Sequence, residues 1–459
     1  MSWTPEEAKE LSGRILALSK AEECEVTLID DESSHTRFAA NDVTTSGTSR
    51  GLTITITSRG GSKSGTVTTN ETDPDALKRA VARSEELMSV ALVDPEFAEG
   101  LGPQKYQFIE AAWSDETAKA GAAQRGAGVR EALEAGRGKS LESSGFFETE
   151  MIGTAIASKK GLFGFHRSTR ASWSATMRTA DGTGSGWAGF ASPRFGEISA
   201  KDLVARAAAK ASSAAGPKPL DPGRYTVILE PQAVADLLSG LAFALSARAA
   251  DEGRSYFSKP GGGNRIGETL FPESVSLASD PSDARIPARP WVGAGGGFGG
   301  GGGGGFGFGG AGSIWGLPSR RVPWIEKGVL KNLSVDRYWA KKTSQEPVPY
   351  SGSIVMQGGT GSVDDLVAKT DRGLLVTRFW YIRTVNPQTL QQTGLTRDGV
   401  WLVEGGKITG PVNNFRFNES PANLLKNAEA MSAAVSTGTM VVPAIKSKDF
   451  NFSSKSDAI

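Results

Sequence analysis

Cysteine and histidine are scarce in this chain, whose 459 residues include one cysteine and two histidines. The single thiol, Cys24, excludes an internal disulfide framework and any zinc site built from several cysteines. A protein without disulfides suits a reducing compartment. We therefore expect a cytoplasmic protein.

Long apolar runs and an excess of one charge are also missing. The sequence contains no stretch of about eighteen uninterrupted apolar residues, the length that a membrane-spanning helix needs. Charges recur every few positions near the N-terminus, which is unlike a secretion signal. The net charge is +1, whereas a dedicated nucleic-acid binder needs a concentrated basic surface. We expect neither a membrane nor a nucleic acid as partner.

The few candidate ligands for a metal are poorly spaced. His35 and His166 lie more than a hundred residues apart, and a catalytic zinc usually takes at least two nitrogen or sulfur ligands. Each histidine is more typical of a half-buried strand, and we expect no metal on this chain. A nucleophilic pair of Cys24 and His35 is possible in space, but no electropositive context marks the thiol as activated.

Motifs for phosphate binding and serine hydrolysis fail on their spacing. The tripeptide Gly138-Lys139-Ser140 resembles the end of a phosphate loop, but Leu133 stands where the first glycine belongs. The sequence has no GxSxG motif. The glycine-rich tract at 293–316 matches a dinucleotide fingerprint only trivially, and we expect it to be a flexible inserted loop.

Periodicity predicts an α+β protein with two domains. Residues 1–217 form an N-terminal domain of α/β type with mixed strands and helices, and 218–459 form a C-terminal domain rich in antiparallel β-sheet. The Pro- and Gly-rich segment 216–223 marks the boundary. In the first domain, alternation and helical spacing predict strands at 25–29, 35–38, 52–57, 148–159, 161–179 and 184–192, with helices at 73–91, 114–136 and 198–215.

A strand feeding a helix is the clearest local feature of the second domain. The β-branched run at 226–229 passes through Glu230 into a segment of helical apolar spacing, with Pro231 suited to the first turn. Hairpins are predicted at 320–334 and 399–412, and a helix at 422–434.

Aromatic and arginine side chains are dense in the segment GLLVTRFWYIR at 373–383. We predict Arg378, Trp380, Tyr381 and Arg383 as candidate residues for peptide or partner binding, because such residues anchor interfaces. Alternation places apolar or aromatic residues on both faces, so a central strand packed between two layers explains the segment equally.

Several segments in order resemble the TldD/TldE family, also called PmbA, of candidate metallopeptidases and modulators of DNA gyrase. The resemblance covers most of the chain. It rests on RFAANDVTTSG, GRYTVILEPQAVADLL, ALSARAADEGRSYF, LPSRRVPWIEKGVLKNLSVDRYWAKK, GLLVTRFWYIRTVNPQT and WLVEGGKITGPVNNFRF.

The resemblance implies a degenerate zinc site. In a TldD-type subunit, an HExxxH helix follows a strand like 226–229 and a C-terminal cysteine completes the ligands. Here Pro231 stands at the first histidine, Gln232 at the glutamate and Asp236 at the second histidine. No cysteine follows Cys24.

A TldE-type, non-catalytic subunit of a zinc peptidase complex is therefore the function that the resemblance implies. It also implies a zinc-carrying TldD-type partner in a heterodimer or homo-oligomer, and unstructured peptides as substrates. A stand-alone peptide- or protein-binding module descended from the peptidase is the alternative. A third, weaker reading is an enzyme with a relocated site.

Overall fold

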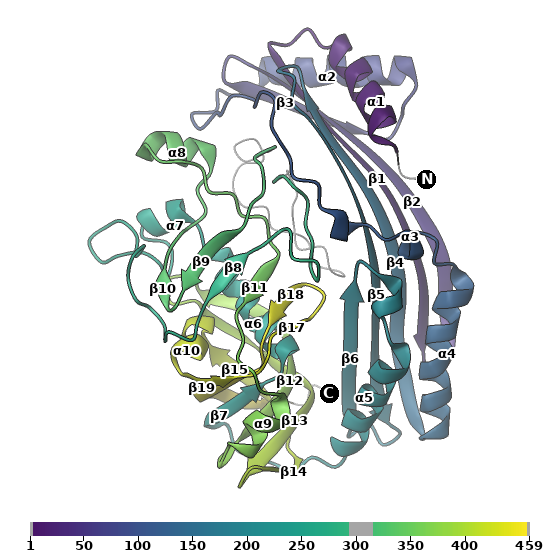
Figure 1. The fold of residues 1–459 in the computed structure, drawn as a ribbon, viewed down its shortest axis with the longest axis vertical. Helices are drawn as coiled ribbons and strands as arrows, with labels where there is room; N and C mark the ends of the chain where they lie inside the picture. The colour runs from purple at the N-terminus through teal and green to yellow at the C-terminus, as the bar shows by residue number, and fades with distance from the viewer. Residues whose placement is uncertain (1–2, 293–314, 457–459) are drawn as a thin grey trace.

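A long, curved sheet and a second body on its concave side make up the molecule (Figure 1). The computed structural model describes residues 3–292 and 315–456. Helices and strands both contribute large parts of it, so the α+β prediction is confirmed. No helix in these two ranges is long and apolar enough to cross a bilayer.

The first sheet has six antiparallel strands in the order β3-β2-β1-β4-β5-β6. The predicted strands at 25–29 and 35–38 are one continuous strand, because the polar residues between them pair with both neighbours. The strands are β1 Glu23–Ala39, β2 Asp42–Gly60, β3 Lys63–Thr69, β4 Leu141–Ser158, β5 Phe163–Thr179 and β6 Ser185–Ser192.

Helices cover the convex face of this sheet (Figure 1), and alternate strand residues turn apolar side chains toward them. Val26 and Leu28 pack beneath α1 and α2 at one end, while Trp173 and Met177 pack beneath α4 and α5 at the other. Thr4 caps the first of these helices, since its hydroxyl accepts from the amide of Glu7. The helices are α1 Pro5–Leu18, α2 Pro74–Val90, η1 Glu110–Ala112, α3 Asp115–Ala118, α4 Ala122–Gly138, η2 Phe195–Glu197 and α5 Ala200–Ser213.

Five strands of the second body close into a ring. Strand β12 pairs in parallel with β7, and antiparallel pairings run on through β19, β15 and β13 back to β12. Five buried phenylalanines contact one another between these strands: Phe379, Phe415, Phe417, Phe450 and Phe452. The strands are β7 Gly223–Leu229, β12 Arg372–Asn386, β13 Gln391–Glu404, β14 Lys407–Pro411, β15 Asn414–Glu419 and β19 Ile445–Ser456.

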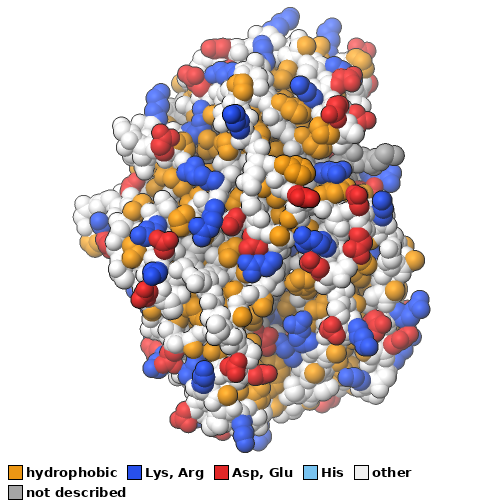
Figure 2. Space-filling model, in the orientation of Figure 1, with side chains coloured by type: hydrophobic (Ala, Val, Ile, Leu, Met, Phe, Trp, Pro, Cys, Tyr) orange, Lys and Arg blue, Asp and Glu red, His pale blue; other side chains and the backbone are white. Residues whose placement is uncertain are grey.

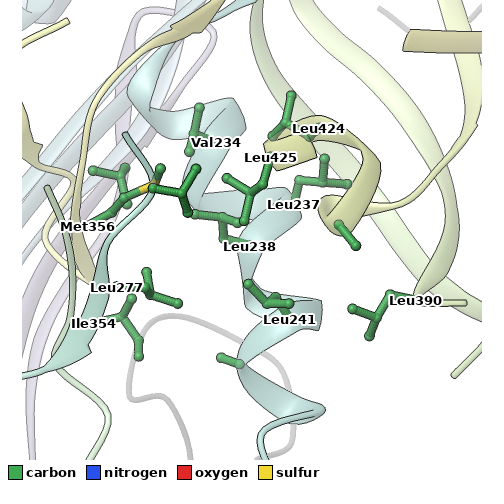
Figure 3. Close-up of a cluster of buried hydrophobic side chains, with 14 of the residues drawn as sticks. Val234, Leu237, Leu238, Leu241, Leu277, Ile354, Met356, Leu390, Leu424 and Leu425 are labelled. Carbon is green, nitrogen blue, oxygen red and sulfur yellow. The ribbon is translucent and has the colours of Figure 1, made fainter. Parts of the chain in front are cut away.

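Helix α6, Pro231–Phe243, is buried between the ring and a third sheet of order β10-β9-β8-β11-β18-β17. Figure 3 shows its leucines between Ile354 and Met356 on one side and Leu424 on the other. The remaining elements are α7 Ala247–Asp251, β8 Leu277–Ser279, β9 Val322–Glu326, β10 Val329–Leu330, α8 Arg337–Thr343, β11 Ile354–Met356, α9 Val363–Ala368, α10 Pro421–Lys426, β16 Ala428–Met431, β17 Val435–Ser436 and β18 Met440–Val442.

One local prediction in the second body is wrong, and another falls mostly outside the described residues. The helix predicted at 422–434 ends at Lys426, because the following residues form β16 and pair with β19. Most of the glycine-rich insertion, 293–314, lies outside the described residues. Its last two residues are packed: Trp315 is buried and donates to the Thr27 hydroxyl, and Tyr106 donates to the Gly316 carbonyl.

The close approach of α5 to β6 gives a stability test. A Cβ on Gly186 would lie 2.3 Å from both the Ala207 carbonyl oxygen and the Ala211 amide nitrogen. We predict that Gly186→Ala lowers the free energy of unfolding by about 1–3 kcal/mol, since backbone cannot move aside cheaply.

The matched control is Gly126→Ala in α4, where a Cβ meets nothing within 4 Å. This change should raise stability by about 0.5–1 kcal/mol, because alanine loses less backbone entropy in a helix. Urea unfolding of both variants measures the contrast. Equal effects of the two substitutions would refute the packing of α5 on β6.

Candidate functional site at the strand–helix junction

The junction between β7 and α6 lies in the centre of the second body. Strand β7 is flanked by β12 and β19, and Val227 to Leu229 are fully buried. Glu230 is extended and its amide donates to the Val376 carbonyl at 3.0 Å. Pro231 then starts the helix, as its spacing predicts.

In the first turns of α6, both carboxylate oxygens of Asp236 accept hydrogen bonds. Gln232 and Asp236 lie one turn apart on one face, and the Gln232 amide nitrogen donates to Asp236 Oδ1 at 2.8 Å. The second oxygen, Oδ2, accepts from the backbone amide of Phe379 at 2.9 Å. The Oδ2 contact therefore holds α6 against β12, whereas the Oδ1 contact stays within the helix.

The carboxyl of Asp236 has an unusual proton affinity. Its side chain is half-buried as a whole, but the protein around the carboxylate removes its hydration. Desolvation raises the pKa of Asp236 to about 6, although the charge of Arg378 and the Phe379 amide act in the opposite direction.

An ion pair from α5 contacts this junction. Lys210 of α5 donates to the Glu230 carboxylate at 2.6 Å, and its ammonium lies 3.4 Å from the Thr377 hydroxyl. Both charged side chains are largely buried, with 15% and 19% of their surface exposed. Such a buried pair holds α5 in a fixed position against the junction, because separating the two partners would leave an uncompensated buried charge.

The junction residues do not suit a zinc ion. Pro231 has no donor side chain, Gln232 is a poor zinc ligand, and both oxygens of Asp236 are engaged. Within residues 3–292 and 315–456, no three His, Cys, Asp or Glu side chains are grouped to hold a metal.

The two histidines lie on the first sheet, away from the junction. His35 is opposite Glu148, which is opposite Ser172, and His166 is six residues along the same strand. The two imidazoles are thus separated by roughly 20 Å at the rise of a β-strand. Burial lowers the pKa of His166 to about 4, so it is neutral at physiological pH.

The alternative nucleophilic pair of Cys24 and His35 is wrong. Cys24 lies in the core beneath α1, whereas the odd-numbered His35 faces the opposite side of the same strand, stacked on Phe146. Burial also raises the pKa of the Cys24 thiol, which disfavours the thiolate.

The candidate binding residues on β12 separate into two places. Trp380 and Tyr381 are exposed by 43% and 56%, and Arg383 stacks on the Tyr381 ring at 4.4 Å. Register shifts in the pairing with β13, together with the positive φ of Tyr381, interrupt the alternation that the sequence predicts. The first half of β12 is covered on both faces, but this second half is open.

Arg378 lies between the domains instead. Its guanidinium stacks on Trp187 of β6 at 4.5 Å and lies 3.8 Å from the buried carboxylate of Asp398. Asp398 also accepts from the Ser185 hydroxyl at 2.6 Å across the interface. The sequence analysis did not identify this contact. The pair Asp398-Gly399 is typical of a turn, which is the local signal that the strand is irregular here. Both residues have a positive φ in the structure.

The other aromatic side chains of this half have structural roles. Trp324 is buried and donates to Ser279, while Trp339 donates to Asp251. Phe379 belongs to the phenylalanine cluster of the ring. Figure 2 shows basic and acidic side chains interspersed over one face, in keeping with the small net charge.

Family models match nearly the whole chain. The PmbA/TldA metallopeptidase domain 1 matches residues 24–87, the central domain 115–215 and the C-terminal domain 222–454. The C-terminal model alone spans more than half of the sequence. Among curated proteins, no sequence matches the chain.

Solved structures share this fold at low sequence identity. A candidate modulator of DNA gyrase from Thermotoga maritima is 17% identical, with a TM-score of 0.82 over 97% of this chain and 100% of its own. TldE from Thermococcus kodakarensis is 19% identical, with a TM-score of 0.81 over 98% and 100%. A candidate modulator of DNA gyrase from Bacteroides thetaiotaomicron is 18% identical, with a TM-score of 0.77 over 98% and 99%.

The raised pKa of Asp236 predicts a pH-dependent stability difference. Because the folded protein holds this proton more tightly than the unfolded chain, the contribution of Asp236 to stability falls as pH rises from about 4 to about 6. Asp236→Asn should therefore match the parent near pH 4 and exceed it by about 1–3 kcal/mol at pH 7.5.

Urea unfolding at several pH values measures this difference, with Asp371→Asn at an exposed position as control. If the difference in unfolding free energy between Asp236→Asn and the parent stayed constant from pH 4 to 7.5, the raised pKa of Asp236 would be contradicted.

Proposed function

Because the chain belongs to the PmbA/TldD metallopeptidase family, we propose that it is the TldE-like, non-catalytic subunit of a zinc peptidase complex. Its partner is a TldD-type subunit, in a heterodimer or a homo-oligomer. The complex hydrolyses unstructured peptides in the cytoplasm. This chain supplies scaffold and binding surface, and the partner supplies the zinc.

The observation that carries the proposal is the state of the strand–helix junction. A zinc peptidase needs a metal that lowers the pKa of a bound water and a carboxylate that moves its proton. At the corresponding positions this chain has Pro231, Gln232 and Asp236, and Asp236 is bound to the Phe379 amide. The residues of this junction hold the helix in place rather than activate a water.

The open half of β12 supports the presence of a partner. Trp380, Tyr381 and Arg383 form an exposed group at the end of a strand whose first half is covered. Aromatic and arginine side chains are the residue types that anchor interfaces. We assign this group, the β12 tip, to contact with the partner or with its peptide.

A stand-alone binding module descended from the peptidase is the second candidate. The same exposed residues of the β12 tip favour it, since they could hold a peptide without any partner. The two functions differ in whether a TldD-type protein with an HExxxH motif co-purifies with this chain.

The first test concerns metal content. We predict that the purified chain binds no stoichiometric zinc, because the junction offers no set of nitrogen or sulfur ligands. Elemental analysis after exchange into chelator-free buffer measures it. About one tightly held zinc per chain would refute the non-catalytic assignment.

The second test is reconstitution with a TldD-type protein. We predict that the mixture cleaves unfolded peptides while this chain alone cleaves none. Gln232→Ala should leave the mixture active, since that side chain has no proton to transfer, and replacing the glutamate of the partner's motif should abolish cleavage. Peptide-cleavage assays measure both variants.

Association is measured separately by size-exclusion chromatography. Trp380→Ala should weaken the complex about tenfold or more, as the loss of an aromatic anchor usually does. Phe108→Ala, at an exposed position outside the β12 tip, is the matched control. Chelator-resistant cleavage by this chain alone would instead favour a relocated active site.

A further inference from the structure

A cavity of about 450 Å³ lies between the concave face of the first sheet and β13 of the ring. The register of the sheet brings its walls together, since Ser144 is opposite Thr176 and Glu142 is opposite Arg178. Its lining consists of Arg37, Phe38, Ala39, Glu142, Ser144, Gly145, Phe146, Thr176, Arg178 and Arg397. The volume falls within the usual range for small-ligand sites.

Positive charge dominates this cavity. Arg37, Arg178 and Arg397 come from three different strands, and Glu142 is the one acidic residue in the lining. Burial lowers the pKa of Arg397; the Asp398 carboxylate acts in the opposite direction, and the positive charges of Arg378 and Arg178 lower the pKa further. Converging guanidinium groups repel one another, so an anion bound among them is strongly favoured.

The surrounding contacts orient two of these arginines. Arg397 stacks on the Trp380 ring at 4.3 Å and lies 3.9 Å from the Asp398 carboxylate. Arg37 is exposed at the mouth of the cavity, and none of the acidic side chains in the described part of the chain forms a salt bridge with it. One guanidinium is thus held in place, and another remains available to a ligand.

The rest of the lining suits an organic body attached to the anion. The hydroxyls of Ser144 and Thr176 can donate hydrogen bonds, and the half-buried ring of Phe146, stacked on His35, supplies an apolar wall. Inorganic phosphate has no apolar group that could pack on this wall, whereas the side chain of a peptide residue can.

We propose that this cavity binds the C-terminal carboxylate of a short peptide. Guanidinium groups bind a carboxylate through paired N–H donors, the hydroxyls complete its hydrogen bonds, and the last side chain packs on Phe146. That the ligand is a peptide rests on the proposed function. The site would make this chain prefer peptides that end in a free carboxylate.

Calorimetry on the full chain alone tests the site with two tripeptides ending in leucine, one with a free carboxylate and one with a terminal amide. The free acid should bind about tenfold more tightly or better, as expected for charge-assisted hydrogen bonds. Equal binding of acid and amide, or binding of inorganic phosphate without binding of the acid, would overturn the proposal.

Variants locate the binding. Arg37→Gln should weaken binding of the free acid about fivefold to tenfold while leaving the amide unchanged. Arg397→Lys should also weaken it, since lysine keeps the charge but loses the forked donors. The control is Arg50→Gln on the neighbouring β2, an exposed arginine paired with Glu32. An equal effect of Arg37→Gln and Arg50→Gln would refute the site.

Arg37 is exposed, so its replacement should not disturb folding, and it tests the cavity even if a change at Arg397 does. Circular dichroism of each variant monitors the fold. The isolated chain is used without the TldD-type protein. Failure of peptide binding is therefore distinct from failure of the complex to form, so each proposal can be rejected separately.

Discussion

The pairing of β12 with two neighbours at once is the constraint on which the second body depends. Its parallel ladder with β7 and its antiparallel ladder with β13 close the ring, and a closed ring leaves no unpaired edge among its members. Closure places the Phe379 amide against Asp236 and so anchors α6. The register shifts that follow direct Trp380 and Tyr381 outward.

Contact between the two halves of the chain combines specific polar pairs with small apolar clusters. Lys210 meets Glu230, and Ser185 meets Asp398, each at hydrogen-bond distance. Trp291 adds a buried aromatic contact against Tyr106. Buried polar pairs add little net stability, but breaking one is costly, so they select one arrangement of the ring on the sheet. That arrangement creates the arginine-lined cavity.

Under the proposed function, this chain keeps the architecture of its family and serves binding instead of catalysis. The junction that would carry a metal in a TldD-type subunit is filled here by Gln232 and Asp236, bonded to each other. The polar side chains proposed to contact a ligand or partner lie elsewhere, at the β12 tip and in the arginine-lined cavity. A binding role needs just such exposed anchors and convergent donors.

Local features follow from the sequence because they depend on near neighbours. The Thr4 cap, the strand at 226–229 and the helix that starts at Pro231 are all readable from residues within a few positions. The expectation that zinc ligands are replaced at 231, 232 and 236 likewise came from the sequence alone, through the family resemblance.

Tertiary structure decided what depends on distant partners. The end of α10 at Lys426 reflects the pairing of β16 with β19, which overrides helical spacing. The proton affinity of Asp236 depends on burial and on an amide 143 residues away. The cavity unites β1, β4, β5 and β13, and the openness of Trp380 results from register shifts. Periodicity reports which residues share a face, but burial, register and charge proximity are set only when the strands assemble.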